Sequence, residues 1–214
     1  MSSSIKARPI TNLWTDKQRY NFQDFENALL KHEGSIKNYP YLDTAGYITT
    51  CKGKNIDDYN TFINTNWLYD NRLATEQEKI LAYNTLKKMP YGKKYNSDTF
   101  QDDTNLRLSE DYCQELYEDD LLKNYIQLQR SIPNYNKMPF PTQLAILETH
   151  YNTGSLTDKN KWPSLHKYAN EYNQSKVCEN LRRSTYDRNG NLISNMPQRN
   201  AWAYDYCMKE PFEP

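Results

Sequence analysis

The sequence predicts an α+β protein that is mostly α-helical, and three features of the chain support this fold class. A long stretch beginning at Ser109 has apolar residues at helical spacing, and shorter stretches before and after it repeat that spacing. Residues 43–46 have the composition of a tight turn, and residues 47–50 have β propensity. The chain has 214 residues, which predicts one domain or one domain with an additional lobe.

The composition indicates a globular chain with an aromatic core. The mean hydropathy is only −1.02, but the chain contains 19 tyrosines and 4 tryptophans, which can build a core while keeping a polar tip in water. The 27 basic residues balance the 27 acidic residues. A balanced charge argues against general affinity for nucleic acid, because that affinity depends on clustered Lys and Arg.

The termini carry no recognisable targeting or membrane segment. Residues 1–19 are predicted to form a polar N-terminal arm, and residues 209–214 a short C-terminal tail. The first residues lack the apolar region of a secretory signal peptide. No stretch approaches the length of apolar sequence that a transmembrane helix needs. We therefore expect a protein that is made in the cytoplasm without a signal peptide and has no membrane span.

Four cysteines, Cys51, Cys113, Cys178 and Cys207, are spread along the chain. Their spacing matches no zinc-binding pattern, and neither His150 nor His166 has neighbours that would make it a metal ligand. We favour free or buried thiols and packed or surface histidines, and we expect no metal or other cofactor. The alternative for the cysteines is disulfides formed after export, whose pairing the sequence leaves open.

A helix is predicted over residues 20–33, followed by a loop and hairpin over residues 35–54. Apolar residues at helical spacing place Glu33 on the inward face of the helix, directly before Gly34. Partial burial there would raise the pKa of a carboxyl and suit a proton donor, although a solvated helix-end glutamate is the simpler interpretation. Asp43 opens the turn and Thr49 lies on the β run; alone, they would be a turn cap and an ordinary strand residue.

Residues 55–105 are polar, and one helix is predicted within them. Thr75 and Glu78 form a capping box before an apolar helical pattern that ends near Met89–Gly92. Core packing is the favoured role for the aromatic residues of this segment, and stacking on sugar rings is the alternative. The aromatic residues considered are Trp67, Tyr69 and Tyr91.

Five further elements are predicted after residue 105. They are a long helix capped by Ser109 and ending near Pro133, a helix over 143–151 capped by Thr142, a helix beginning at Pro163, a hairpin around Asn189-Gly190, and a final helix beginning at Met196-Pro197. This succession of helices makes the second half of the chain predominantly helical.

The front motif resembles the catalytic signature of the phage-type lysozymes, glycoside hydrolase family 24. The matching residues are Glu33-Gly34 and Tyr41-Leu42-Asp43-Thr44-x-Gly46-Tyr47-x-Thr49, in which Asp43 lies ten residues after Glu33. The resemblance implies that Glu33 is the general acid and that Asp43 and Thr49 hold the attacking water or stabilise the cation. The sequence departs from the family after Thr49, where Cys51 replaces a glycine and Lys54 replaces a histidine.

Weaker matches follow in order along the chain. Tyr151-Asn152-Thr153-Gly154 resembles a helix end in that family and implies that Asn152 lines the cleft. Pro197-Gln198-Arg199 resembles a helix start whose arginine packs against the catalytic glutamate, so Arg199 is expected to orient Glu33. The resemblance implies a two-lobed catalytic domain over residues 20–208. The small lobe carries a β-hairpin and covers about 34–108, with an insertion at about 55–105. The helical lobe covers about 109–208, and the long helix joins the two lobes.

The resemblance implies a muramidase, which hydrolyses the β-1,4 bond between N-acetylmuramic acid and N-acetylglucosamine in peptidoglycan. Two alternatives stay open: a non-lytic peptidoglycan-binding or toxin-like module with this fold, and a glycosidase directed at chitin or chitosan. The expected partner is the glycan strand. An enzyme without a signal peptide would need a holin or a secretion system to reach the cell wall, and a secreted effector would have a cognate inhibitor.

Overall fold

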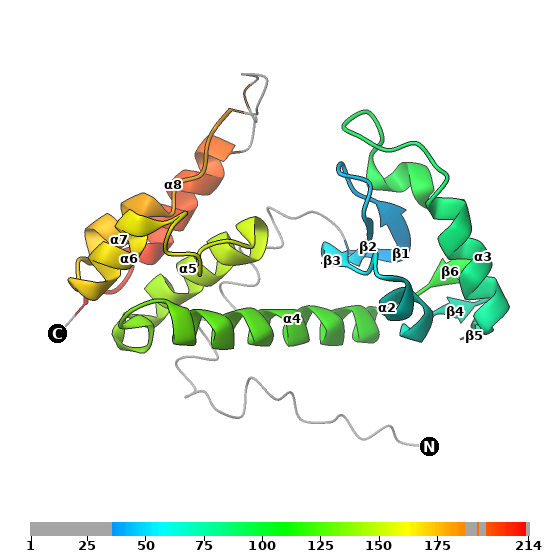
Figure 1. The fold of residues 1–214 in the computed structure, drawn as a ribbon, viewed down its shortest axis with the longest axis horizontal. Coiled ribbons are helices and arrows are strands. Elements are labelled where there is room, and N and C mark those ends of the chain that lie inside the picture. Colours follow the sequence, from blue (N-terminus) through cyan, green and yellow to red (C-terminus); the bar gives the residue numbers. More distant parts are fainter. Residues whose placement is uncertain (1–35, 187–191, 193–195, 213–214) are drawn as a thin grey trace, which may run out of the picture. The chain divides into compact units, whose positions relative to one another are not determined.

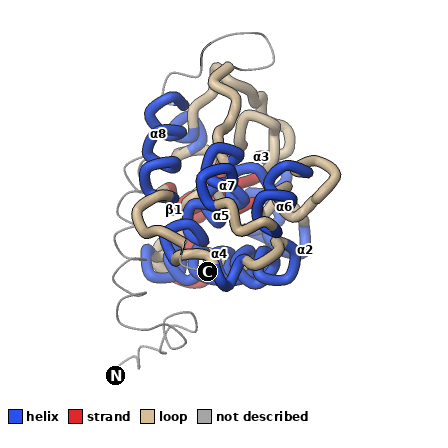
Figure 2. The backbone as a smooth tube through the Cα atoms, turned by 90° about the vertical axis from the view of Figure 1, so that its left-hand side faces the viewer, coloured by secondary structure: helices blue, strands red, loops and turns tan. Residues whose placement is uncertain are grey.

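The computed structural model of the protein describes residues 36–186, 192 and 196–212, and it has an α+β fold in which helices predominate (Figures 1 and 2). The chain divides into two compact units. We call residues 33–119 the β-containing unit, and residues 1–32 together with 120–214 the helical unit. Each unit is described separately below.

The six named strands all lie in the β-containing unit, where helices alternate with them along the chain. The β-containing unit holds β1 (Lys37–Leu42), β2 (Ile48–Cys51), β3 (Lys54–Asn55), α2 (Tyr59–Asn64), β4 (Leu68–Tyr69), β5 (Arg72–Leu73), α3 (Glu76–Leu86), the 3-10 helix η2 (Ser97–Phe100) and β6 (Leu106–Arg107). α4 (Glu110–Ser131) crosses the boundary of the units. The helical unit continues with the 3-10 helix η3 (Tyr135–Lys137), α5 (Phe140–Thr153), α6 (Pro163–Asn170), α7 (Gln174–Asn180) and α8 (Met196–Cys207).

The predicted hairpin is present and is larger than the sequence indicated. β1 and β2 pair antiparallel, with Tyr41 opposite Thr49, and β3 adds a third strand to give the order β1-β2-β3. The segment before Asp43, predicted as a loop because of Pro40, is strand β1 instead. The sheet tolerates Pro40 because β1 is an edge strand whose register shifts between Lys37 and Tyr41, and a proline has no N–H to pair there.

A second three-stranded sheet, in the order β5-β4-β6, was not predicted. β4 and β5 are joined by Asp70 and Asn71, whose positive φ angles of 47° and 64° suit a two-residue hairpin turn. The core of the β-containing unit contains residues of both sheets and includes Trp67, whose indole N–H donates to the carbonyl of Phe62 at 3.0 Å. The favoured role of Trp67 in core packing is therefore confirmed.

Two of the predicted helix starts are confirmed by their capping contacts. At α3, the hydroxyl of Thr75 accepts from the backbone N–H of Glu78, and the Glu78 carboxylate accepts from the N–H of Thr75 at 2.8 Å. At α4, the Ser109 hydroxyl accepts from the N–H of Tyr112 at 3.2 Å. α4 ends at Ser131, two residues before Pro133, as predicted.

The helical unit is built around α5, which packs against α7 and α8 (Figure 2). Every residue of α5 from Phe140 to His150 is buried. The predicted cap at Thr142 is wrong, because α5 begins earlier and Pro141 occupies its first turn. The buried Thr142 hydroxyl donates instead to the carbonyl of Cys207 at 2.8 Å.

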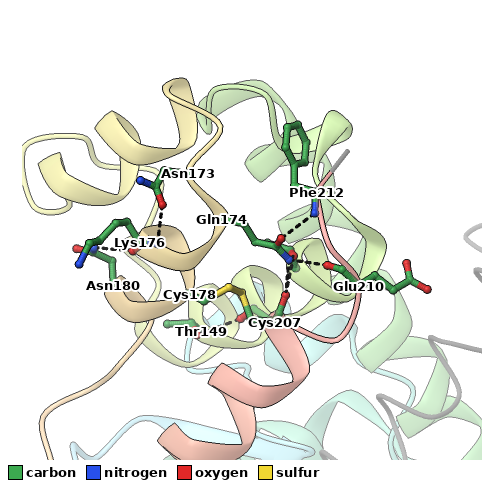
Figure 3. Close-up of a disulfide and its surroundings, with 11 residues drawn as sticks. Thr149, Asn173, Gln174, Lys176, Cys178, Asn180, Cys207, Glu210 and Phe212 are labelled. Atoms are coloured by element: carbon green, nitrogen blue, oxygen red, sulfur yellow. Dashed lines mark hydrogen bonds between the residues drawn. A yellow bond between two sulfur atoms is a disulfide. The ribbon is translucent and has the colours of Figure 1, made fainter. Parts of the chain in front are cut away.

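The four cysteines form two disulfides, so the favoured interpretation as free thiols is wrong. Cys51 pairs with Cys113 in the β-containing unit, and Cys178 pairs with Cys207 in the helical unit (Figure 3). The partners are 62 and 29 residues apart, so the folded chain brings them together and local spacing carries no signal. Beside the second disulfide, the Gln174 side chain donates to the carbonyls of Cys207 and Glu210 at 2.9 and 2.7 Å.

Other expectations are tested only in part, or not at all, by the described residues. The hairpin expected around Asn189-Gly190 has an antiparallel bridge between Tyr186 and Leu192, while residues 187–191 are outside the description. The predicted arm 1–19 and helix 20–33 also lie outside the described residues. Within residues 36–186, 192 and 196–212, no helix has the length and apolar character required to cross a membrane.

Candidate functional site

The five residues expected to form the site fall into three groups. Asp43 and Thr49 lie on the first hairpin of the β-containing unit, whereas Asn152 and Arg199 lie in the helical unit. Glu33, the expected acid, lies outside the described residues. The structure therefore brings the expected residues together in two pairs, each within one unit.

Asp43 is held by the turn that it opens. Its Oδ1 atom accepts hydrogen bonds from the backbone N–H groups of Ala45 and Tyr47, at 2.8 and 2.9 Å. The turn is closed by two backbone bonds, from Asp43 N to Tyr47 O and from Gly46 N to Asp43 O. Gly46 has a φ of 87°, which a residue with a side chain rarely adopts. These contacts fix the direction of the Asp43 carboxylate.

The second carboxylate oxygen of Asp43, Oδ2, does not take part in the hydrogen bonds of the turn. Within the part of the chain that the structure describes, no hydrogen bond reaches Oδ2. The side chain is partly exposed. One oxygen thus holds the turn, and the other can accept a hydrogen bond from water or stabilise a nearby positive charge.

Thr49 lies in β2, six residues after Asp43, and is 4% exposed. Its hydroxyl donates to the carbonyl of Tyr47 at 3.2 Å. Because the hydroxyl hydrogen is used within the hairpin, only the lone pairs of Oγ1 can bind another group. Across the described segments, the structure shows no hydrogen bond between the side chains of Thr49 and Asp43.

Arg199 and Asn152 meet in the helical unit at a residue that the sequence did not indicate, Glu148. Arg199 donates from Nε and Nη2 to Oε1 of Glu148, at 3.1 and 2.9 Å, and from Nη2 to Oδ1 of Asn152 at 3.1 Å. Asn152 donates to the backbone carbonyl of Glu148 at 2.9 Å. The expected pair is therefore part of a polar cluster that joins α5 to α8, in which Glu148 and Arg199 are buried and Asn152 is exposed.

A second arginine completes this cluster. Arg183 Nη2 donates to the same Oε1 of Glu148 at 3.1 Å. The Asn200 side chain accepts from the Arg183 backbone N–H at 3.0 Å and donates to its carbonyl at 2.8 Å. We call Glu148, Asn152, Arg183, Arg199 and Asn200 the Glu148 cluster. Its charge-assisted bonds, two of which run from Arg199 to one oxygen of Glu148, hold the Arg199 guanidinium in one orientation.

Two features of the sequence could have identified Glu148. It is the single acidic residue in the helical run of residues 140–153, and it lies four residues before Asn152, on the same helix face. Arg183 gave no comparable signal, because it follows α7 in a segment without periodicity.

Both described histidines contact the backbone of Leu156. His150 Nδ1 accepts from the Leu156 N–H at 3.2 Å, and His166 Nε2 lies 2.9 Å from the Leu156 carbonyl oxygen. These contacts agree with the interpretation of both as packed residues. Among the described residues, no group of three or more His, Cys, Asp or Glu side chains could hold a metal ion.

Comparisons with known proteins do not assign a family. No protein-family model matches the sequence, and a search of curated proteins found no match.

Proposed function

We propose that this protein is a peptidoglycan hydrolase of the muramidase class, with Glu33 as the general acid. The observation that carries the proposal is the Asp43 carboxylate, which two backbone N–H groups hold at the tip of a hairpin with one oxygen left for a ligand. Asp43 is the second of three residues, Glu33, Asp43 and Thr49, whose order along the chain resembles that of the catalytic residues in the phage-type lysozymes. Hydrolysis of a glycosidic bond characteristically uses two carboxyl groups in this way.

The proposed roles follow from the chemistry of the bond. Glu33 protonates the leaving oxygen, and Asp43 acts at the opposite face of the sugar, where it guides water or stabilises the oxocarbenium-like state. Thr49 accepts a hydrogen from that water through the lone pairs of Oγ1, since its own hydrogen is donated to Tyr47. The separation of the two carboxyl groups decides the stereochemical outcome, about 5–5.5 Å for retention and about 6.5–9.5 Å for inversion.

Arg199 is proposed to orient Glu33. The support is the Glu148 cluster, in which Nη2 of the Arg199 guanidinium donates to both Glu148 and Asn152. Asn152 acts in this proposal as a support for Arg199. A fixed guanidinium suits this purpose because it presents its donors in one plane and loses little freedom on binding a carboxylate.

The two disulfides support a proposal that the protein acts outside the cytoplasm, on the cell wall. Disulfides persist in oxidising compartments and are rare where thiol reductants are abundant. Release through a holin pore or through a secretion system would bring the enzyme to its substrate, and a secreted effector would be accompanied by a cognate inhibitor.

The test is release of reducing sugar from purified peptidoglycan, together with zymography, for the wild type, Glu33→Gln and Asp43→Asn. We expect Glu33→Gln to lose activity by about 10²–10⁴-fold, the range for a general acid. Asp43→Asn keeps an oxygen that can accept the hydrogen bonds from the two N–H groups of the turn. A loss of activity in this variant would therefore show that the negative charge of Asp43 is required. Glu171→Gln, at an exposed glutamate after α6, serves as the control.

The possible outcomes separate the candidate functions. A Glu33→Gln protein as active as the wild type would overturn the assignment. Binding of the wild type to peptidoglycan without release of reducing sugar would indicate a non-lytic module. Products from chitin or chitosan in the absence of products from peptidoglycan would indicate the third candidate.

A further inference from the structure

A pocket of about 260 Å³ lies beside the hairpin turn, wholly within the β-containing unit. Its lining combines apolar, aromatic and charged side chains from the turn, from the loop after β3 and from α3 and the loop that follows it. We call it the turn pocket, and it is lined by Leu42, Ala45, Gly46, Tyr47, Asp57, Leu86, Lys87, Met89 and Tyr91.

Two tyrosines at this pocket expose much of their side chains. Tyr47 is 50% exposed and Tyr91 is 57% exposed. The expectation that Tyr91 packs in the core is therefore wrong. The backbone of Tyr47 is fixed all the same, because its N–H donates to Asp43 Oδ1 and its carbonyl accepts from the Asp43 N–H. Exposed aromatic rings on a fixed backbone are typical of binding surfaces.

The ring of Tyr91 lies against the turn at a position that only glycine allows. A Cβ atom at Gly46 would be 2.9 Å from Cδ1, Cε1 and Cζ of Tyr91, a distance that real Cβ atoms essentially never show. The contact places the ring of Tyr91 on the turn that holds Asp43. The pocket is thus continuous with the part of the molecule that carries the proposed chemistry.

An ion pair supplies the polar part of the pocket. Lys87 Nζ lies 2.8 and 3.1 Å from Oδ1 and Oδ2 of Asp57, and Asp57 Oδ1 also accepts from the Ile48 N–H at 2.9 Å. The contact with Asp57 raises the pKa of Lys87, so the ammonium stays charged at neutral pH. The two charges cancel, and this balance suits a neutral ligand that both donates and accepts hydrogen bonds.

We propose that the turn pocket binds one N-acetylglucosamine ring of the glycan strand. The apolar face of the ring contacts Tyr91 and Tyr47, and its hydroxyl or acetamido groups bond to Asp57 and Lys87. The volume lies just below the usual range of ligand pockets, about 300–1,000 Å³, and therefore fits a single ring. This inference rests on the proposed function, because it names a binding position for that substrate.

The test measures affinity for a soluble trimer of N-acetylglucosamine by calorimetry and, in parallel, the KM and kcat on peptidoglycan. For Tyr91→Ala, we expect affinity for the trimer to fall about tenfold and KM to rise with little change in kcat, since an interaction made equally in ground and transition states affects KM alone. Tyr91→Phe should retain binding, because the ring remains. Tyr59→Ala removes an exposed tyrosine of the same unit outside the pocket and should bind as the wild type does.

The possible results distinguish the turn pocket from the muramidase proposal. Unchanged trimer affinity and KM in Tyr91→Ala, with hydrolysis by the wild type intact, would overturn the turn pocket and leave the muramidase proposal standing. Binding of the trimer that Tyr91→Ala weakens, in a wild type that releases no reducing sugar, would support the pocket and overturn the muramidase. A wild type that does not bind the trimer would also overturn the pocket.

Discussion

The carboxylate of Glu148 is fully buried and out of contact with solvent. Its side chain is 0% exposed, and one of its oxygens accepts bonds from both Arg183 and Arg199. Removing a carboxylate from water costs several kcal/mol, which its attraction to buried guanidinium groups offsets only when the geometry is good. A buried ion pair of this kind adds little net stability, but breaking it is expensive because the remaining charges stay buried.

The prediction for this residue is that Glu148→Gln lowers the free energy of unfolding by about 3–5 kcal/mol. Glutamine keeps the shape and some hydrogen bonds but removes the negative charge that two guanidinium groups share. Urea unfolding followed by circular dichroism measures the effect. Glu179→Gln, at an exposed glutamate paired with Lys176, is the matched control and should change little. A similar small change for Glu148→Gln would contradict the prediction.

The sequence anticipated two of the five residues of this cluster. Asn152 and Arg199 were expected at the site from short motifs, and the structure joins them directly at 3.1 Å. Glu148, Arg183 and Asn200 were not expected, because their meeting depends on how α5, α8 and the segment after α7 pack. A helical pattern shows which face of a helix is apolar, but it does not show which charged residue from a distant segment will be buried against it.

His150 takes part in the end of α5 through its backbone and in the following turn through its side chain. The N–H of Gly154, at a φ of 64°, donates to the His150 carbonyl at 2.7 Å and terminates the helix. The chain then turns so that the Leu156 N–H donates to His150 Nδ1 at 3.2 Å. Burial lowers the pKa of His150, and a protonated Nδ1 could not accept this bond. The neutral imidazole is therefore the form that fits the folded chain.

This arrangement predicts that stability falls as the pH is lowered below about 6.5, the ordinary pKa of histidine. The unfolded chain binds a proton at His150 there, whereas the folded chain does so only at lower pH, so protonation favours unfolding. The contribution of neutral His150 to the free energy of unfolding is fully present above pH 6.5. It declines as the pH falls toward the pKa of His150 in the folded chain. Its slope cannot exceed about 1.4 kcal/mol per pH unit for one group.

Urea unfolding at pH 7 and pH 5 checks this expectation against His150→Asn. Asparagine offers an oxygen in place of Nδ1 and does not titrate, so the variant should lose less stability between the two pH values than the wild type. Glu78 does not interfere, since its bond to Arg72 lowers its pKa to about 2 and its titration lies below this range. Equal losses in the two proteins would show that His150 does not set the pH dependence.

At the level of helices and strands, the sequence predicted the helices better than the strands. The starts of α3, α4 and α8 carry capping residues or a first-turn proline, which are local signals. Strands β3 to β6 are only two residues long, so no alternation of apolar and polar residues can appear in them. Their existence depends on pairing between segments as distant as β4 and β6.

Across the whole chain, each compact unit has its own buried core and its own disulfide. Cys51–Cys113 closes a segment of 62 residues in the β-containing unit, and Cys178–Cys207 closes one of 29 residues in the helical unit. In the chain-entropy model, these closures stabilise by about 4.3 and about 3.6 kcal/mol, respectively. Because each bridge lies within one unit, each should stabilise mainly that unit.

Native-state hydrogen exchange of two double variants tests this division. We expect Cys178→Ala/Cys207→Ala to reduce the protection of amides in α5, α7 and α8 while leaving β1 and β2 unchanged, because proteins open locally in contiguous cooperative units. Cys51→Ala/Cys113→Ala should give the reverse pattern and serves as the matched control. Because α4 crosses the boundary, its amides report in both variants whether the two units unfold together. Loss of protection along all of α4, with equal losses in both units, would contradict the prediction and show that the chain unfolds as one cooperative body.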